Sequence, residues 1–349
     1  MPSYRITRER AAHTAHVQEG RPFDVPAKST LLMAAQAAGL DWPYGCRVGV
    51  CGRCRLKLLH GSVSALGDHA ATLGADAVSD RYILACRSLL ESDVLVLPPD
   101  QAAGHDDDVR GTITRVTRPV HEIAVLEIAL ETPFSNGYAA GQYARLSVPD
   151  AVPPRCFSFA TACRGDARVE FHVRLFPEGR LAGWLTADDV TGAGVSVSQP
   201  LGEISLAEVS ADDELLFVAG GTGLSPVLAM VEELAGWIGP RPRVKLLYAA
   251  RDQAHLYAAT RLRSLARRFE AGRFDFVPVL SREPGDSGWT GRRGHLFDHL
   301  GEVAPGEGAS RRAFLCGPPG LVDATELALL KLGWPRAAIA ADRFIPAFD

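Results

Sequence analysis

The sequence lacks the long apolar runs and the charge excess that mark several large classes of protein. Among its 349 residues the longest stretch without a charged side chain, 215–231, is broken by three glycines and a proline. A membrane-spanning helix needs about 20 mostly apolar residues. The first ten residues are partly basic but hold no apolar segment typical of a secretory signal. Since the net charge is only -4, wholesale nucleic-acid binding is not expected either. We therefore expect a cytoplasmic protein that binds neither membranes nor nucleic acid.

Two catalytic signatures and a disulfide framework are also missing. There is no G-x-S-x-G nucleophile elbow and no C-x-H pair of a Rieske centre. Seven cysteines are an odd number, and the chain is long and carries no export signal, so disulfide bonds are a poor explanation for them. A hydrophobic content of 47% is normal for a folded globular protein.

Composition divides the chain into three parts. The length allows two or three domains. A Pro-Pro pair leads into the polar stretch 100–108, which we interpret as a linker after a first domain, 1–99. Residues 101–208 hold 14 acidic and 9 basic side chains, so the middle of the chain is acidic. We place the remaining boundary between a second domain, 109–210, and a third, 211–349.

Three cysteines of the first domain fall within nine residues. Cys46, Cys51 and Cys54 form C-x4-C-x2-C, and Cys86 follows after 31 intervening residues. This spacing matches the ligand set of a plant-type [2Fe–2S] cluster, in which one tight loop supplies three thiolates. The alternative is a structural zinc site, which usually shows two similar C-x2–4-C pairs. The other three cysteines (Cys156, Cys163 and Cys316) are expected to be small buried hydrophobes.

The segment 43–54 resembles the plant-type ferredoxin domain, and this resemblance implies a β-grasp fold. The cluster rim of a typical plant ferredoxin is acidic, whereas this rim is basic, with Arg47, Arg53, Arg55, Lys57 and Arg87. The rim is either a solvated face or a docking surface for an acidic partner, because complementary charge raises encounter rates. Docking would then weaken with added salt.

Hydrophobic patterns differ between the second and third domains. Strand-like runs separated by turn residues (111–117, 123–130, 142–148, 156–160 and 169–175) predict a small antiparallel barrel. From residue 214 onward, apolar strands alternate with helices at 225–237, 258–269 and 321–332. That alternation predicts a doubly wound parallel sheet. The fold class is therefore multidomain, with α+β, all-β and α/β parts.

The barrel segment carries an R-x-F-S sequence, and a glycine-led turn further on opens a helix. Such a turn presents N–H groups to a phosphate. The order resembles the flavin domain of the ferredoxin–NADP reductase superfamily. The resemblance implies that Arg155 pairs with the flavin phosphates, Phe157 contacts the flavin and Ser158 lies near its N5. It also assigns to the site the strand residues His172, Val173 and Arg174, and the pyrophosphate donors Gly179, Arg180, Leu181 and Ala182. Phe157 replaces the usual Tyr and Ala182 the usual Ser or Thr, which leaves FMN as the alternative to FAD.

The third domain opens with a glycine-rich loop between a buried strand and a helix. Gly220, Gly221, Thr222, Gly223 and Pro226 form G-G-T-G-x-x-P, in which glycines let the backbone approach a pyrophosphate. The motif again resembles the reductase superfamily, where Thr222 would lie near the flavin and nicotinamide rings. A later C-G-P turn (Cys316, Gly317 and Pro318) would place its cysteine beside the nicotinamide. The alternative for Cys316 is a buried core residue.

The choice of nicotinamide cofactor depends on side chains that follow the second and third strands of this domain. Arg251, Ser281 and Arg282 are candidates for contacts with the adenosine ribose or a 2′-phosphate. NADH is favoured because the related reductases mostly use it, with NADPH as the alternative. Phe344 near the end of the chain either stacks on the flavin, as in many superfamily members, or simply packs.

The order ferredoxin, flavin domain, dinucleotide domain resembles the reductase components of ring-hydroxylating dioxygenases and diiron monooxygenases, which act in aromatic hydrocarbon catabolism. It implies an electron path from NADH through FAD and the [2Fe–2S] cluster to a separate oxygenase or its intermediate ferredoxin. A Rieske dioxygenase is favoured, with a diiron monooxygenase next. The alternatives are a deoxysugar dehydratase or cytochrome P450 as acceptor, or an iron–sulfur redox sensor without turnover. Ser158, Thr222 and Cys316 are the expected catalytic residues.

Overall fold

A computed structural model describes residues 13–17, 22–40, 42–44, 49, 52, 54–97, 108–148, 152, 154–187, 189–303 and 310–344. The chain divides into two compact units, residues 1–105 and 106–349. No helix in these described ranges is long and apolar enough to span a membrane.

The first unit is built on a five-stranded mixed sheet with one helix packed against its core. The strand order is β2-β1-β7-β3-β5, where β1 and β7 are parallel and the other pairs antiparallel. The bounds are β1 (His13–Val17), β2 (Phe23–Val25), β3 (Arg55–His60), β5 (Tyr82–Leu84), β7 (Val94–Leu97) and helix α1 (Leu31–Ala37). The Thr30 side chain accepts a hydrogen bond from the Met33 N–H, which caps the start of α1. Short elements between β3 and β7 are β4 (Val63–Ala65), α2 (Ala70–Leu73), α3 (Ala75–Ser79), η1 (Ala85–Arg87) and β6 (Ser88–Leu90).

The second unit begins with an antiparallel barrel, as predicted. Its strand order is β11-β10-β13-β8-β9-β12. A bridge between Phe159 and Phe171 joins the two outermost strands and closes the sheet. The bounds are β8 (Val109–Val120), β9 (Ile123–Leu130), β10 (Tyr143–Ser147), β11 (Arg155–Ser158), β12 (Arg168–Arg174), helix α4 (Arg180–Ala187) and β13 (Gly194–Val197).

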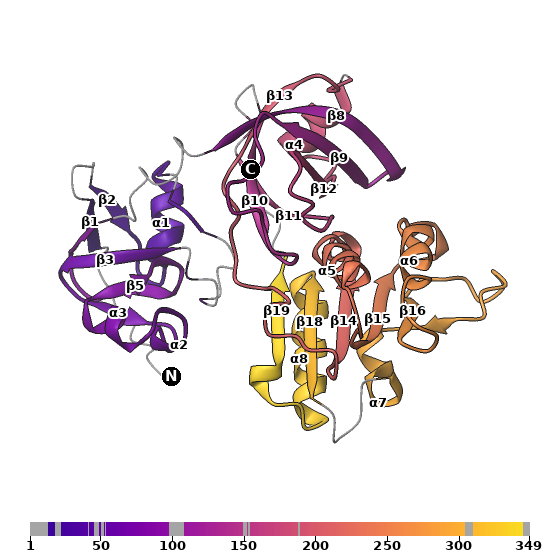
Figure 1. Ribbon diagram of the computed structural model, residues 1–349. Helices are drawn as coiled ribbons and strands as arrows, with labels where there is room; N and C mark the ends of the chain where they lie inside the picture. Colours follow the sequence, from indigo (N-terminus) through magenta and orange to yellow (C-terminus); the bar gives the residue numbers. More distant parts are fainter. Residues whose placement is uncertain are drawn as a thin grey trace, which may run out of the picture. The chain divides into compact units, whose positions relative to one another are not determined.

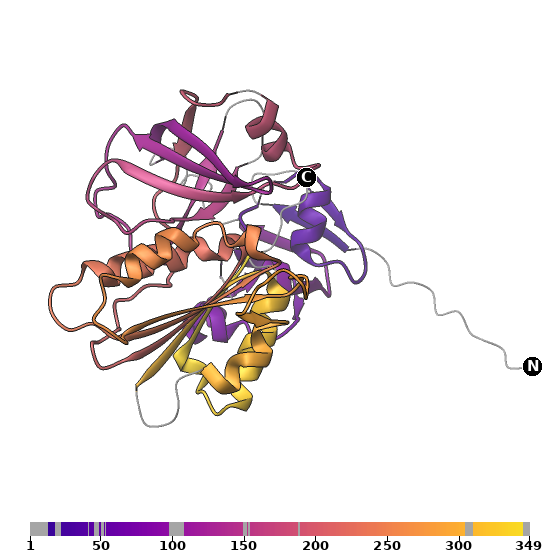
Figure 2. The ribbon, with the colours of Figure 1, turned by 90° about the vertical axis from the view of Figure 1, so that its right-hand side faces the viewer.

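The unit ends with the predicted parallel sheet, in the order β17-β16-β15-β14-β18-β19 (Figure 1). Helices α5 and α6 cover one face and α7 and α8 the other (Figure 2). The bounds are β14 (Glu214–Gly220), η2 (Gly221–Gly223), α5 (Leu224–Gly236), β15 (Arg243–Ala250), η3 (Gln253–His255), α6 (Ala259–Ala266), β16 (Phe274–Leu280), β17 (Arg292–Arg293), η4 (Leu296–His299), α7 (Leu300–Val303), β18 (Arg311–Gly317), α8 (Pro319–Lys331), η5 (Arg336–Ala338) and β19 (Ile339–Arg343). Parallel strands align their carboxyl ends, so β14, β15, β16 and β18 end at one edge.

Three details of the sequence prediction were wrong. The side chain of Cys156 is exposed rather than buried, because residues alternate between the two faces of β11 and Cys156 falls on the outer one. Cys163 is only half-buried. Helix α6 ends at Ala266, three residues before the predicted end, where a turn begins with a hydrogen bond from the Phe269 N–H to the Ala266 carbonyl.

Candidate functional site

Two of the four predicted cluster ligands lie in the described part of the first unit, and they lie side by side. Cys54 immediately precedes β3 and Cys86 lies in η1 after β5, and both side chains are buried. The Cys86 N–H donates a hydrogen bond to Cys54 Sγ, with N and Sγ 3.4 Å apart. Such a bond stabilises a thiolate, the form of cysteine that binds metal. Cys46 and Cys51 lie outside the described residues.

The described part of the cysteine loop is held closely by its neighbours. Gly49 and Gly52 have φ values of 89° and 69°, which only glycine adopts easily. A side chain at Gly49 would place its Cβ 2.8 Å from Arg87 Cγ. The Thr72 hydroxyl donates to the Gly49 carbonyl at 2.5 Å. This tight curvature fits a loop that wraps a small inorganic cluster.

Three basic residues of the predicted rim are close neighbours of these cysteines. Arg55 and Lys57 lie on β3, which begins directly after Cys54, and Arg87 follows Cys86 in η1. The Arg55 guanidinium carbon is 3.9 Å from the centre of the Tyr82 ring, and Lys57 Nζ is 5.3 Å from it. Arg87 follows Cys86 and packs its stem against Gly49. Arg47 and Arg53 lie outside the described residues.

The R-x-F-S motif lies on barrel strand β11, with alternating orientation. Ser158 is buried, whereas Arg155 and Phe157 are half-buried. The Arg155 guanidinium donates to the carbonyl of Pro154 at 3.3 Å. Phe157 lies against Phe171 of β12, with ring centres 6.3 Å apart. The strand thus presents the three motif residues along one short segment.

The glycine-led turn of the barrel does open a helix, α4. The Gly179 N–H, a predicted pyrophosphate donor, bonds to the Phe176 carbonyl at 2.9 Å within the turn. The N–H groups of Leu181 and Ala182 belong to the first turn of α4 and have no acceptor inside that helix. The side chain of Ala182 is buried in the barrel core, so this residue can offer only its backbone.

The glycine-rich loop and the C-G-P turn pack backbone against backbone at the carboxyl edge of the parallel sheet. A Cβ at Gly223 would lie 2.2 Å from the Cys316 carbonyl oxygen. A Cβ at Gly317, which has a φ of 148°, would lie 3.0 Å from the Gly220 carbonyl oxygen. Thr222 lies in η2, and Pro226 in the first turn of α5. The two predicted nucleotide segments therefore form one surface.

Cys316 and Phe344 also lie at this edge. Cys316 is fully buried, and burial raises the pKa of its thiol well above the usual value, so it is a neutral group. The Phe344 N–H donates to the Gly317 carbonyl at 2.8 Å, which places the aromatic residue beside the C-G-P turn. Pro318 precedes α8 in the same turn. The predicted roles of Cys316 and Phe344 stay predictions.

Charges of both signs lie at the ends of β15 and β16. Arg251 forms an ion pair with Glu122 of the barrel. The Arg282 side chain is exposed, and the Ser281 hydroxyl donates to the Ala250 carbonyl at 3.4 Å. Glu283 accepts from the Gln253 N–H at 2.9 Å and from Gln253 Nε2 at 2.5 Å.

Hydrogen bonds keep two carboxylates ionised at this edge. Hydrogen bonds from the Ser287 and Gln253 side chains lower the pKa of Glu283. A hydrogen bond from the His255 side chain lowers the pKa of Asp252. The edge therefore carries two fixed negative charges beside the exposed Arg282, whereas the charge of Arg251 is paired with Glu122.

Known proteins resemble the chain over almost all of its length. Residues 15–91 match the 2Fe-2S iron-sulfur cluster binding domain family and residues 217–326 the oxidoreductase NAD-binding domain family. The chain is 34% identical to the xylene/toluene monooxygenase electron transfer component of Pseudomonas putida, covering 93% of this chain and 91% of that protein. It is 32% identical to the reductase component of a naphthalene 1,2-dioxygenase system of Pseudomonas putida, covering 93% and 95%.

A solved structure agrees with these relatives. The crystal structure of an Amycolatopsis cytochrome P450 reductase superposes with a TM-score of 0.66 at 30% identity, covering 96% of this chain and 99% of that one. The chain belongs to the family of electron-transfer reductase components of oxygenase systems. This reductase component is an NAD(P)H-dependent oxidoreductase, and its cofactors are a [2Fe–2S] cluster, FAD and a nicotinamide dinucleotide, as the sequence predicts.

Sequence reasoning missed a group of polar residues where the barrel of the reductase component meets its nucleotide domain. His172, predicted to contact a cofactor, bonds through Nδ1 to the Tyr257 hydroxyl at 2.9 Å and through Nε2 to Glu170 at 3.0 Å. Val173 is buried in the barrel core, and Arg174 is exposed. Glu170 and its partner Arg261 are 91 residues apart, and no motif links them.

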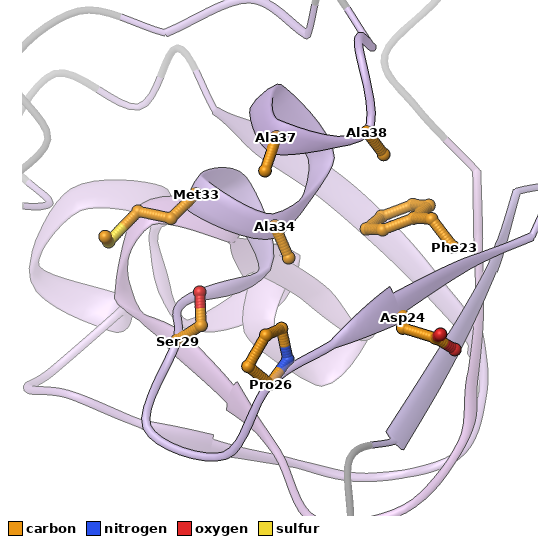
Figure 3. Close-up of a pocket in the computed structure, with 8 residues that line it drawn as sticks. All are labelled: Phe23, Asp24, Pro26, Ser29, Met33, Ala34, Ala37 and Ala38. Atoms are coloured by element: carbon orange, nitrogen blue, oxygen red, sulfur yellow. The ribbon is translucent and has the colours of Figure 1, made fainter.

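Two hollows of the reductase component are lined by other residues than the predicted site residues. One, of about 360 Å³, lies between β2 and α1 in the first unit and is mostly apolar (Figure 3). The other, of about 410 Å³, is lined by residues 203–208 and by the starts of β18 and β19, the edge opposite to the nucleotide loops. No predicted site residue lines either hollow.

Proposed function

We propose that the protein takes a hydride from NADH and passes the electrons, one at a time, through FAD and the [2Fe–2S] cluster to a separate oxygenase component. One observation carries the proposal: relatives that match over more than nine-tenths of both lengths are electron-transfer components of monooxygenases and dioxygenases. When bound, the cofactors supply the conversion of a two-electron donor into one-electron carriers.

The chain's own residues bind and orient these groups. Arg155 would pair with the flavin phosphates, and the N–H groups at the start of α4 would face the pyrophosphate. The loop 220–223 would let the dinucleotide backbone approach closely. Cys54 and Cys86, together with Cys46 and Cys51, would hold the two irons.

NADH fits the edge beyond β15 and β16 better than NADPH does. The Glu283 carboxylate is held there by Gln253, and Asp252 is ionised beside it. A 2′-phosphate would add about two negative charges next to these carboxylates, whereas ribose hydroxyls can donate to them. Arg251 does not offset this repulsion, because its charge is paired with Glu122.

The acceptor docks on the basic rim formed by Arg55, Lys57 and Arg87, continued in sequence by Arg47 and Arg53. Charge complementarity of this kind raises association rates and is screened by salt. Arg55→Glu should therefore slow electron transfer to the oxygenase and flatten its dependence on ionic strength. Arg268→Glu, the same charge change at an exposed site of the second unit, is the control. Two results would contradict docking on the rim. One is an equal rate of electron transfer in the two variants, and the other is a rate in the unchanged protein that does not depend on salt.

The class of acceptor is decided by reconstitution. We would combine the reductase and NADH with a Rieske dioxygenase component, with a diiron monooxygenase component and with a cytochrome P450, and measure product formed per NADH consumed. Coupled turnover with either of the first two supports the proposal. Turnover with the P450 alone would favour the second candidate, which rests on the 30% identity to the Amycolatopsis reductase. A redox sensor would give no product with any of them.

A further inference from the structure

One strand of the barrel, β12, carries a polar face that bonds to the nucleotide domain through Glu170 and His172. In β12 alternate residues point to opposite sides. Val169, Phe171 and Val173 are buried in the barrel core. Glu170, His172 and Arg174 lie on the other face. Glu170 bonds to Arg261 of α6 and His172 to Tyr257 in the segment before α6, and Arg174 lies near the glycine-rich loop.

Arg261 of α6 is the centre of this contact. Its Nη1 donates to Glu170 Oε1 at 2.6 Å, and its Nη2 donates to the Ala160 carbonyl at 3.0 Å. Nη2 also lies 3.3 Å from Glu232 Oε2 of α5. One planar guanidinium thus joins two barrel acceptors to a carboxylate of its own domain, a geometry that a lysine ammonium does not reproduce.

Two successive carboxylates of α5 hold the barrel from the nucleotide side. Glu232 accepts from the Ala162 N–H at 3.1 Å and from Arg164 Nη2 at 2.6 Å. Glu233 accepts from the Ala140 N–H at 3.3 Å. The amino end of α5 is the glycine-rich loop, about 12 Å away at about 1.5 Å per residue. The helix that faces the dinucleotide is therefore itself bound to the barrel.

The outer face of β12 ends near the glycine-rich loop. A Cβ at Gly221 would lie 3.8 Å from Arg174 Nη1, so the last residue of β12 lies close to the loop predicted to receive the dinucleotide. Buried ion pairs of this kind add little net stability, but they fix one arrangement of the groups they join. Hydride transfer needs such an arrangement, because a displacement of about 1 Å costs up to about a hundredfold in rate.

We propose that the outer face of β12 is the docking surface that fixes the nucleotide domain on the flavin barrel, with Arg261 as the positioning residue for hydride transfer. This inference rests on the proposed function in one respect, that a nicotinamide reduces a flavin held by the barrel. Arg261 acts through Glu170 and Glu232 and touches neither reacting group.

The test compares Arg261→Lys with Arg263→Lys, an exposed residue of the same helix. In the holoenzyme we would measure FAD content, hydrogen exchange of the Ala162 N–H and the rate constant of flavin reduction at saturating NADH. We expect Arg261→Lys to keep its FAD, to lose protection at Ala162 and to reduce its flavin about tenfold more slowly, with little change in NADH affinity. Arg263→Lys should behave as the unchanged protein.

Three results would overturn the inference. One is a rate constant of flavin reduction per bound FAD that is unchanged in Arg261→Lys. Another is an unchanged rate constant in Glu170→Gln, which removes the negative charge that the barrel offers to Arg261. The third is a loss of FAD or of thermal stability with the rate of the remaining holoenzyme intact, which would indicate a merely structural role. If NADH fails to reduce the flavin of the unchanged protein, the proposed function fails instead.

Discussion

The backbone N–H of Cys86 donates a hydrogen bond to Sγ of Cys54 across 3.4 Å. The two cysteines are 32 residues apart, and strands β3 and β5 pair so that the end of one meets the start of the other. The fold thus brings the fourth predicted ligand to the cysteine loop.

Replacing Cys54 with Ser should remove the cluster and spare the flavin. The hydroxyl is a far poorer ligand than a thiolate, so the iron–sulfur absorbance should be lost. Reduction of cytochrome c by NADH should then stop, while reduction of ferricyanide, which the flavin can perform directly, continues. Cys163→Ser is the matched control, since Cys163 is half-buried in the second unit. Equal loss of both activities in Cys54→Ser would contradict the order of the centres.

Replacing Gly223 with Ala should damage the nucleotide site. The new Cβ would lie 2.2 Å from the Cys316 carbonyl oxygen and 2.5 Å from its carbon, so one of the two loops must move. Overpacking of this kind costs about 1–3 kcal/mol. We expect a lower melting temperature and weaker NADH binding, measured by thermal unfolding and by titration.

The control for that change lies at the other end of helix α5. A Cβ added at Gly236 would meet nothing within 4 Å among the described residues beyond its own helix. Gly236→Ala should therefore be neutral or stabilise the protein by about 0.5–1 kcal/mol. A melting temperature of Gly223→Ala as high as that of Gly236→Ala would show that the backbone contact is unimportant.

Glu283→Gln should relax the preference for NADH. Removing this charge lowers the repulsion that a 2′-phosphate meets, so the ratio of kcat/KM for NADPH to that for NADH should rise about tenfold. Glu270→Gln removes an exposed carboxylate elsewhere in the domain and should leave the ratio unchanged. If Glu283→Gln also leaves it unchanged, this carboxylate does not select the cofactor.

Acid should destabilise the contact between barrel and nucleotide domain. Burial lowers the pKa of His172, although Glu170 beside it acts in the opposite direction. The unfolded chain therefore takes up the proton first below about pH 6.5, and the free energy of unfolding falls by at most about 1.4 kcal/mol per pH unit. Glu170 adds to this at lower pH, because burial is outweighed by His172 and Arg261, which lower its pKa. Its contribution is present above about pH 4.5 and is lost as the pH falls further.

The measurement is the thermal transition followed by flavin fluorescence between about pH 8 and pH 5. The groups facing His172 are Glu170, Arg261 and the Tyr257 hydroxyl. We expect a constant melting temperature above about pH 7 and a fall below about pH 6.5 that is shallower in His172→Gln. His295→Gln, at an exposed histidine, should follow the unchanged protein. A variant at His172 with the same pH profile as the unchanged protein would refute the assignment.

Short-range signals in the sequence predicted much of the fold. Glycines, prolines and apolar runs act locally, so five of the six barrel strands and the helices of the parallel sheet were predicted within a few residues, whereas β13 was missed. The loop 220–223 and the turn at Cys316 were predicted to bind one ligand, and their backbones meet at Gly223.

Long-range pairing of polar side chains could not be predicted in the same way. Glu170 and Arg261 look like ordinary surface residues in the sequence, and only the closed barrel and the packing of α6 bring them together. His172 was assigned to the flavin site together with its strand, and nothing in that pattern indicated its hydrogen bonds to Tyr257 and Glu170. Strand β19, which carries Phe344 to the C-G-P turn, was also missed, because it is short and weakly apolar.

The central claim is a single electron path from nicotinamide through flavin to the cluster, and anaerobic titration of the purified protein with NADH tests it most directly. Visible absorbance resolves the flavin and iron–sulfur bands in one experiment. The account predicts that both sets of bands bleach as NADH is added. Bleaching of the flavin bands with a cluster that stays oxidised would contradict it.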